Sequence, residues 1–267
     1  MNAVTPFERA WHYRELIRAI LSRELAARFR GSVLGWVWAL AAPLIMMGAY
    51  TVVFSGVVAV SGSTAHRSLG SRSLVIFSGI TLFNFFAELL YRAPGLLHEH
   101  AGFIRKSIFP SETLAWIAVL RSAVYAGVSF VILLAFQLFL TRQIPWTIVL
   151  VPAVVAPFFL FLLGTVWFLM ALGAFTRDVT YLMASIAPVL MLTTPVFFSV
   201  SDIPVPIRHW VRLNIVADYI EMFRSVVLYG ELPNWELLAV TTVASYGVFL
   251  IGYAFFVRYK AVFVDVL

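Results

Sequence analysis

A chain of 267 residues with 62% hydrophobic and only 12% charged residues lies outside the range of ordinary water-soluble domains, which carry about 25% charged residues. The absence of cysteine excludes disulfides and thiolate metal sites. The net charge of +6 is modest and unevenly placed, so it indicates membrane orientation and lipid contact rather than nucleic-acid binding. We therefore expect an all-α polytopic membrane protein.

The N-terminal region, residues 7–30, is predicted to form an amphipathic helix that lies flat on a membrane surface. Apolar residues recur there at spacings of three and four, and arginines fall between them. Glu24 and Arg28 are placed to form an i,i+4 ion pair on this helix. An ordinary amphipathic helix that packs on protein is the alternative.

Long uncharged runs follow, each apolar enough to cross a bilayer. The sequence predicts one transmembrane domain, residues 1–267, with six spans at residues 33–60, 74–91, 113–140, 147–175, 179–200 and 237–257. Pro43 is expected to bend the first span.

The connection before the last span, residues 203–235, is too apolar to lie free in water. We predict one or two short helices there that dip into the outer leaflet. Asn214 is placed to cap such a helix and Gly230 to end it, with Asp218, Glu221 and Arg224 on its polar side.

The distribution of Lys and Arg predicts that both termini are cytoplasmic. With Arg121 left out because it lies within a span, this orientation places twelve Lys and Arg residues on the cytoplasmic side and six on the other.

Two ionisable residues, Glu88 and Arg121, fall within predicted spans. Arg121 lies roughly 12 Å along the axis of the third span. An arginine near mid-membrane costs about 2.5–3.5 kcal/mol or more, so it should face the bundle or a wet pathway. A Glu88–Arg121 pair, separate contacts with the interface, and a role in lining a substrate path all remain open.

Several common catalytic motifs are absent from the sequence. It has no phosphate-binding G-x-x-x-x-G-K-[ST] loop, no H-E-x-x-H and no G-x-S-x-G. His98 and His100 flank Glu99, but histidines two residues apart point to different helix faces, so no metal site is expected. We expect no cofactor in this chain.

Four segments together resemble one family of proteins. They are residues 28–38 (RFRGSVLGWVW), residues 97–110 (ending FIRKSIFP), residues 194–199 (TPVFFS), and Asn214 followed by Tyr219, Glu221, Phe223, Arg224 and Leu228. In order and spacing the chain resembles, over nearly its whole length, the membrane subunit of ABC exporters for bacterial capsule and O-antigen polysaccharides. Ile215 departs from the pattern, since relatives often have proline after the asparagine.

The resemblance implies ATP-driven export of a lipid-linked polysaccharide across the bacterial inner membrane. It implies a homodimer with two copies of a cytoplasmic subunit that binds ATP and Mg, and further periplasmic or outer-membrane export proteins. Residues 95–107 would form the coupling helix that docks on the ATPase, through Leu97, His98, Glu99, Phe103, Ile104, Arg105 and Lys106. A surface helix without a partner is the alternative for this segment.

The resemblance also locates a substrate path. Arg28 and Arg30 would lie at its cytoplasmic mouth, where an acidic lipid headgroup would sit; ordinary anchoring to anionic lipid explains them equally well. At the outer side, Trp210, Tyr219, Phe223 and Arg224 are expected near the channel exit, and Trp210 could equally be an interface anchor.

Two other functions remain open. An ABC exporter of drugs or small lipids would share these segments. A membrane-embedded lipid-modifying enzyme would use Glu88, Arg121 and Asp178, although clustered acids and histidines are scarce in this chain.

Overall fold

The computed structural model describes residues 5–28, 30–61, 69–104, 109–198, 211 and 214–266, and every regular element among them is helical. In chain order the elements are α1 (Thr5–His12), α2 (Arg14–Arg28), α3 (Val37–Ser61), α4 (Leu69–Arg92), η1 (Ala93–Gly95), α5 (Leu96–Glu99), α6 (Ala101–Ile104), α7 (Thr113–Thr141), η2 (Trp146–Leu150), α8 (Val151–Phe175), α9 (Asp178–Thr193), α11 (Ile215–Arg224), η4 (Ser225–Tyr229) and α12 (Trp235–Val266).

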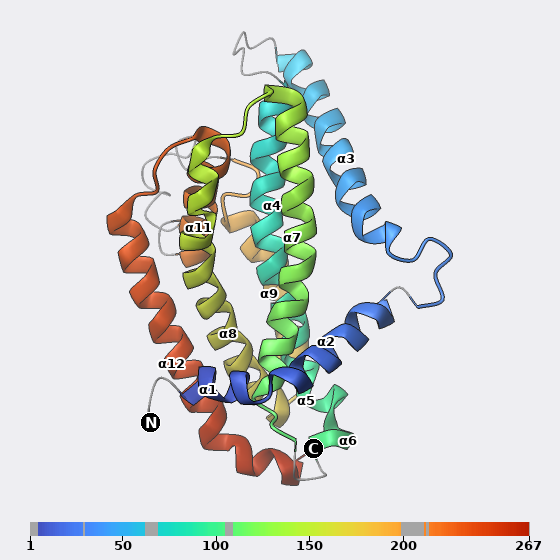
Figure 1. The fold of residues 1–267 in the computed structure, drawn as a ribbon, viewed down its shortest axis with the longest axis vertical. Coiled ribbons are helices and arrows are strands. Elements are labelled where there is room, and N and C mark those ends of the chain that lie inside the picture. The colour runs from blue at the N-terminus through green and yellow to red at the C-terminus, as the bar shows by residue number, and fades with distance from the viewer. Residues whose placement is uncertain are drawn as a thin grey trace.

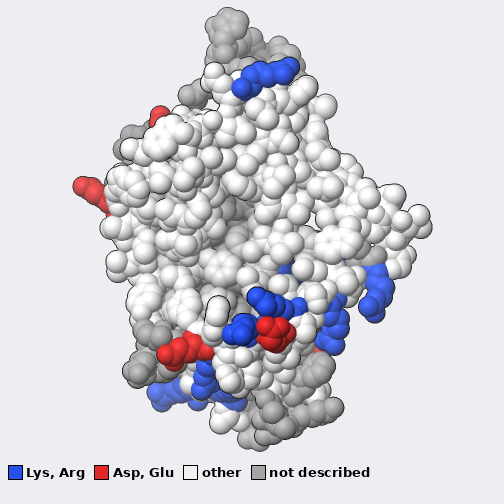
Figure 2. Space-filling model, in the orientation of Figure 1, with Lys and Arg blue, Asp and Glu red and all other residues white. Residues whose placement is uncertain are grey.

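The long helices α4, α7, α8 and α12 stand side by side, and α1 and α2 cross the lower end of this bundle (Figure 1). The helix α3 leans away from the others. Within the described residues, four stretches are long and apolar enough to cross a membrane: Arg72–Glu99, Thr113–Thr141, Trp146–Phe175 and Trp235–Phe263. Charged side chains gather near the lower end of the face in Figure 2, and a broad uncharged band lies above them. This distribution is typical of a bilayer-spanning bundle.

The junction between α2 and α3 is a glycine-containing bend. Gly31 and Gly35 have φ values of 83° and 49°, a region that residues with a Cβ rarely adopt. The helix α3 therefore begins at Val37, four residues after the predicted start of the first span.

Several other predicted segments also differ from the structure in extent. The helix α9 ends at Thr193 rather than 200, because Thr194 precedes a proline and is extended (φ −88°, ψ 141°). The last helix continues to Val266, well past the predicted end at 257. The predicted coupling helix at 95–107 is divided: His100, with φ −110° and ψ 15°, separates α5 from α6, and residues 105–108 lie outside the described part of the chain.

Within the region 203–235, α11 packs against α4 and α8, and most of its side chains are buried. Asn214 caps α11 as predicted, because its side chain accepts a hydrogen bond from the Val216 N–H, and Gly230 ends η4 with φ 71°. The π-helical turn η4 frees carbonyl groups that cannot remain unsatisfied in a membrane. Thr147 Oγ1 and Gln137 Nε2 donate to two of them, at 2.6 and 2.9 Å.

Close backbone contact joins α8 to α12. A Cβ at Gly252 would lie 2.0 Å from the Gly164 carbonyl oxygen, and a Cβ at Gly164 would lie 2.4 Å from the Val248 carbonyl oxygen. Small residues allow two membrane helices to approach this closely and to gain van der Waals contact.

We predict that Gly252→Ala destabilises the protein by about 1–3 kcal/mol, because the added methyl group forces the α8 and α12 backbones apart. Thermal unfolding in detergent measures the change. Gly247→Ala on the same helix is the control, since a Cβ there meets nothing within 4 Å. Equal unfolding midpoints for the two variants would contradict the close contact.

Candidate functional site

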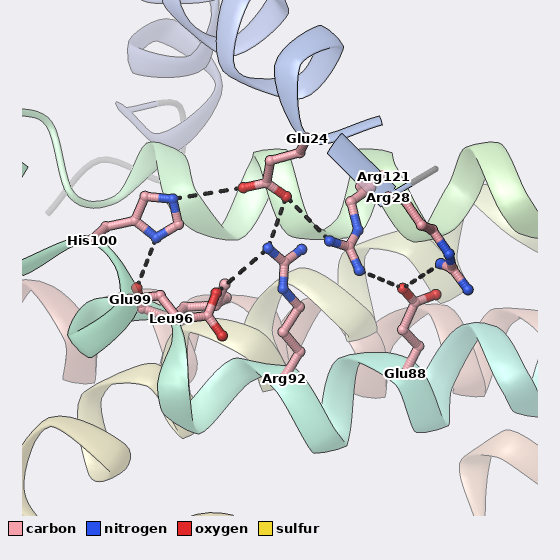
Figure 3. A network of polar contacts seen from close by, with 8 residues as sticks. All are labelled: Glu24, Arg28, Glu88, Arg92, Leu96, Glu99, His100 and Arg121. Atoms are coloured by element: carbon pink, nitrogen blue, oxygen red, sulfur yellow. Dashed lines mark hydrogen bonds and ion pairs between the residues drawn. The ribbon is translucent and has the colours of Figure 1, made fainter. Parts of the chain in front are cut away.

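A network of ion pairs joins α2, α4 and α7 at the lower end of the bundle (Figure 3). At its centre, Glu24 Oε2 accepts from Arg92 Nη2 at 2.8 Å and from Arg121 Nη1 at 3.4 Å. Glu24 Oε1 lies 3.6 Å from His100 Nε2. The side chain of Glu24 is only 12% exposed, so solvent screens these contacts little.

The surroundings of Glu24 keep it ionised. Burial alone would raise the pKa of Glu24, but the hydrogen bond from His100 and the charges of Arg92 and Arg121 outweigh burial and lower it to about 2. The same hydrogen bond raises the pKa of His100. The ion pairs of Glu24 thus contribute fully to stability when the pH is above the usual pKa of a carboxyl group. This contribution is lost as the pH falls towards 2. The His100 contribution is complete below pH 6.5 and is lost as pH rises through the raised pKa.

The second carboxylate of the network is Glu88. Its Oε1 accepts from Arg121 Nη2 at 2.8 Å, which confirms the pair considered from the sequence, and lies 3.4 Å from Arg28 Nη1. The predicted i,i+4 pair between Glu24 and Arg28 is wrong, because each turns to partners on other helices. Asp178 is exposed at the start of α9, and no ion pair among the described residues joins it to Glu88 or Arg121.

A cleft of about 340 Å³ lies between α3, α4 and α7. Its lining combines apolar and polar side chains: Arg28, Trp38, Ala39, Ala42, Pro43, Met46, Phe77, Ile80, Thr81, Asn84, Phe85, Glu88, Ser122, Tyr125, Ala126 and Ser129. The Arg28 guanidinium lies over the ring of Tyr125, 4.1 Å from its centroid. A ligand with an anionic group at Arg28 and less polar groups along the rest of the cleft would match this arrangement.

The two arginines predicted at the mouth therefore differ. Arg28 lines the cleft, whereas Arg30 is exposed in the bend between α2 and α3 and is not part of the lining.

The residues predicted to couple to an ATPase also differ among themselves. Leu97 is fully buried in the core, and His98 Nε2 lies 3.0 Å from the Gly173 carbonyl oxygen, so both hold the segment against α8. Glu99 has a half-exposed side chain, 3.5 Å from Arg92 Nη2. Phe103 and Ile104 belong to α6, while Arg105 and Lys106 lie outside the described residues.

Three residues predicted near the exit, Tyr219, Phe223 and Arg224, are buried inside the bundle. Phe223 is 2% exposed, and the Tyr219 hydroxyl lies 2.8 Å from Ser245 Oγ. Arg224, predicted on a polar helix face, is fully buried and donates to the carbonyl oxygens of Val75, Val196 and Phe198 at 2.8–3.2 Å. A guanidinium can satisfy several carbonyl groups at once, which explains its place in the interior. Trp210 lies outside the described residues.

A second ionic cluster was not predicted. Glu112, just before α7 and 3% exposed, binds Arg9 of α1 and Lys260 of α12, and Trp167 Nε1 donates to its carbonyl oxygen at 3.0 Å. Burial opposes ionisation of Glu112, but hydrogen bonds from Lys260 and Arg9 lower its pKa overall. The sequence does show an acidic residue directly before a predicted span. It does not show the partners of that residue, because they are far away in the chain.

We predict that Glu112→Gln destabilises the protein by about 1–3 kcal/mol near neutral pH, because it removes the charge that pairs with Arg9 and Lys260. Because the pKa of Glu112 is lowered, the difference from wild type should shrink as pH falls through that pKa. Thermal unfolding across pH measures it. Glu236→Gln at an exposed site on α12 serves as the control, and a pH-independent difference would contradict the assignment.

Comparison with known proteins identifies a family and several relatives of this chain. The family described as ABC-2 type transporter matches residues 15–228. The chain is 23% identical over 237 residues to the O-antigen export system permease protein RfbA of Myxococcus xanthus, covering 88% of each chain. It is 22% identical to the protein of the same name from Klebsiella pneumoniae, covering 95% of each. It is 20% identical to the polysialic acid transport protein KpsM of Escherichia coli, covering 90% of this chain and 92% of that one.

The family match spans α2 to η4 and so includes the ion-pair network, the cleft and the buried α11. The all-helical architecture, the apolar spans and this match together show that the chain belongs to the ABC-2 type transporter family of membrane proteins.

Proposed function

We propose that this chain is the membrane subunit of an ATP-driven exporter that moves a lipid-linked surface polysaccharide across the bacterial inner membrane. The observation that carries the proposal is the cleft between α3, α4 and α7, which has Arg28 at one end and mixed polar and apolar walls. The names of the relatives, which export O-antigen or transport polysialic acid, support a polysaccharide as the cargo.

The cleft suits the anionic end of such a substrate. Arg28 is held by Glu88 and Tyr125 but keeps a side chain that is 44% exposed, so it can still receive a phosphate-like group. Polar side chains on α4 and α7, namely Thr81, Asn84, Ser122 and Ser129, would contact hydroxyl groups next to the lipid link. In this proposal Arg30 supplies attraction for anionic lipid near the mouth.

We propose a topology with six membrane passages and both termini cytoplasmic. The four long spans are joined by α3 and by α9, which with the turn after Thr194 would complete the fifth passage beside α11. Because α1, α2 and the end of α12 lie at the same end of the bundle, an even number of passages fits the arrangement (Figure 1).

The driving force would come from a separate subunit. The chain has no nucleotide-binding loop, so we propose a homodimer that binds two copies of a cytoplasmic ATPase carrying ATP and Mg. The segment η1–α5–α6 suits docking because Pro94 and His98 seat it tightly on α8 while Glu99 stays exposed. Further periplasmic or outer-membrane proteins would receive the polymer.

Replacing Arg28 tests the entrance. Arg28→Gln should reduce surface polysaccharide about tenfold or more, because loss of a charge-assisted contact costs about 1.5–3 kcal/mol. Surface polymer is quantified on cells that lack the chromosomal gene and carry the variant. Arg18→Gln, an exposed arginine on the same helix α2, should export normally.

The variant Arg28→Lys distinguishes a need for positive charge from a need for the planar guanidinium group. If a single positive charge suffices, lysine should restore most export, and if the guanidinium makes paired contacts to phosphate, lysine should fail like glutamine. Normal export by Arg28→Gln would contradict the proposed entrance, whatever lysine does.

Replacing Glu99 tests the docking segment. Glu99→Ala should weaken retention of the ATPase subunit on the purified complex, because an exposed charge at the docking surface is removed. Quantitative co-purification at two salt concentrations measures the effect. Glu15→Ala, an exposed acid on α2, should retain the ATPase fully. Equal retention in both variants would contradict the role of Glu99.

A further inference from the structure

We infer that Glu24 is a positioning residue that transmits movement of the ATPase-facing segment to the substrate cleft. The inference rests on the proposed function, because it assumes an ATPase at the segment η1–α5–α6 and a substrate at Arg28.

A continuous series of charge contacts joins these two places (Figure 3). From the docking side, Glu99 lies 3.5 Å from Arg92, and Arg92 lies 2.8 Å from Glu24. From Glu24 the series continues to Arg121 at 3.4 Å and from Arg121 to Glu88 at 2.8 Å. It ends at Arg28, 3.4 Å from Glu88 and in the lining of the cleft.

Glu24 is the central member of this series. Among the described ion pairs it is the one acid that contacts both Arg92 of α4 and Arg121 of α7. It also contacts His100, which lies between α5 and α6 and whose Nδ1–H donates to the Leu96 carbonyl oxygen at 3.0 Å. A single carboxylate on the interfacial helix thus binds two membrane helices and the docking segment.

Two hydrogen-bond donors of the network are available for a different set of ion-pair contacts. Arg92 Nη1 and Arg121 Nε are buried and have no hydrogen-bond partner among the described residues. Polar networks that are partly satisfied can exchange partners when an element moves. A shift of α5 would therefore change which donors Glu24 holds, and α2 with Arg28 at its end would follow.

Without the Glu24 charge, the series divides into two halves. Arg92 would keep Glu99, and Arg121 would keep Glu88, but nothing negative would hold these two cations together. ATP hydrolysis, which occurs on the partner subunit, would continue, while its effect on the cleft would be lost.

The test measures export per ATP hydrolysed. The whole complex, with its ATPase, is reconstituted in vesicles with lipid-linked polysaccharide extracted from the host bacterium. Glu24→Gln should lower the ratio of polymer exported to ATP hydrolysed about tenfold, which corresponds to about 1.4 kcal/mol of lost coupling free energy. ATP hydrolysis and the thermal unfolding midpoint are measured on the same samples.

Glu15→Gln is the matched control, because it is the same substitution at an exposed position of the same helix and should leave the ratio unchanged. Glu24→Asp keeps the charge on a shorter side chain, so it should give an intermediate ratio of polymer exported to ATP hydrolysed. If Glu24→Gln does not fold, Glu24→Asp serves as the test variant in its place. A wild-type ratio in the variant that folds, or a proportional loss of export and hydrolysis, would overturn the role of Glu24. Absence of export by the wild-type complex would instead reject the proposed function.

Discussion

Charge is costly inside a bilayer, and this constraint decides where the ionisable side chains of the chain lie and how they are held. Glu24 and Glu112 each collect cations from two or more helices near the lower end of the bundle, and Glu88 holds Arg121 beside them. The charges gather near that end of the visible face in Figure 2. The same ion pairs that make these charges tolerable therefore also join the interfacial helices to the membrane helices.

The region of α11 and η4 meets the equivalent constraint for the backbone. The π-helical turn η4 interrupts regular hydrogen bonding, which in a membrane is stable only where protein supplies the missing partners. Arg224 donates to carbonyl groups of α4 and of the turn after α9, and Gln137 and Thr147 donate to η4. The buried Arg224 thus holds α11, α4 and the turn after α9 together.

The sequence predicted local features well and distant contacts poorly. Hydropathy located the long helices, although it ended the last one too early, and the roles of Gly230 and Asn214 at helix ends were correctly predicted, because each depends on neighbouring residues. The early end of α9 was missed although Pro195 supplied a local signal. The division of 95–107 and the partners of Glu24 were also missed. They depend on how segments far apart in the chain pack, as with Glu24 and Arg121, for which periodicity carries no signal.

Reconstitution tests the central claim most directly. Vesicles that contain this chain, its ATPase subunit and lipid-linked polysaccharide are supplied with ATP, and a polymer-specific antibody measures the polysaccharide that has crossed. The account predicts transfer only when both subunits and hydrolysable ATP are present. Transfer by this chain without the ATPase, or no transfer by a complex that hydrolyses ATP, would contradict it.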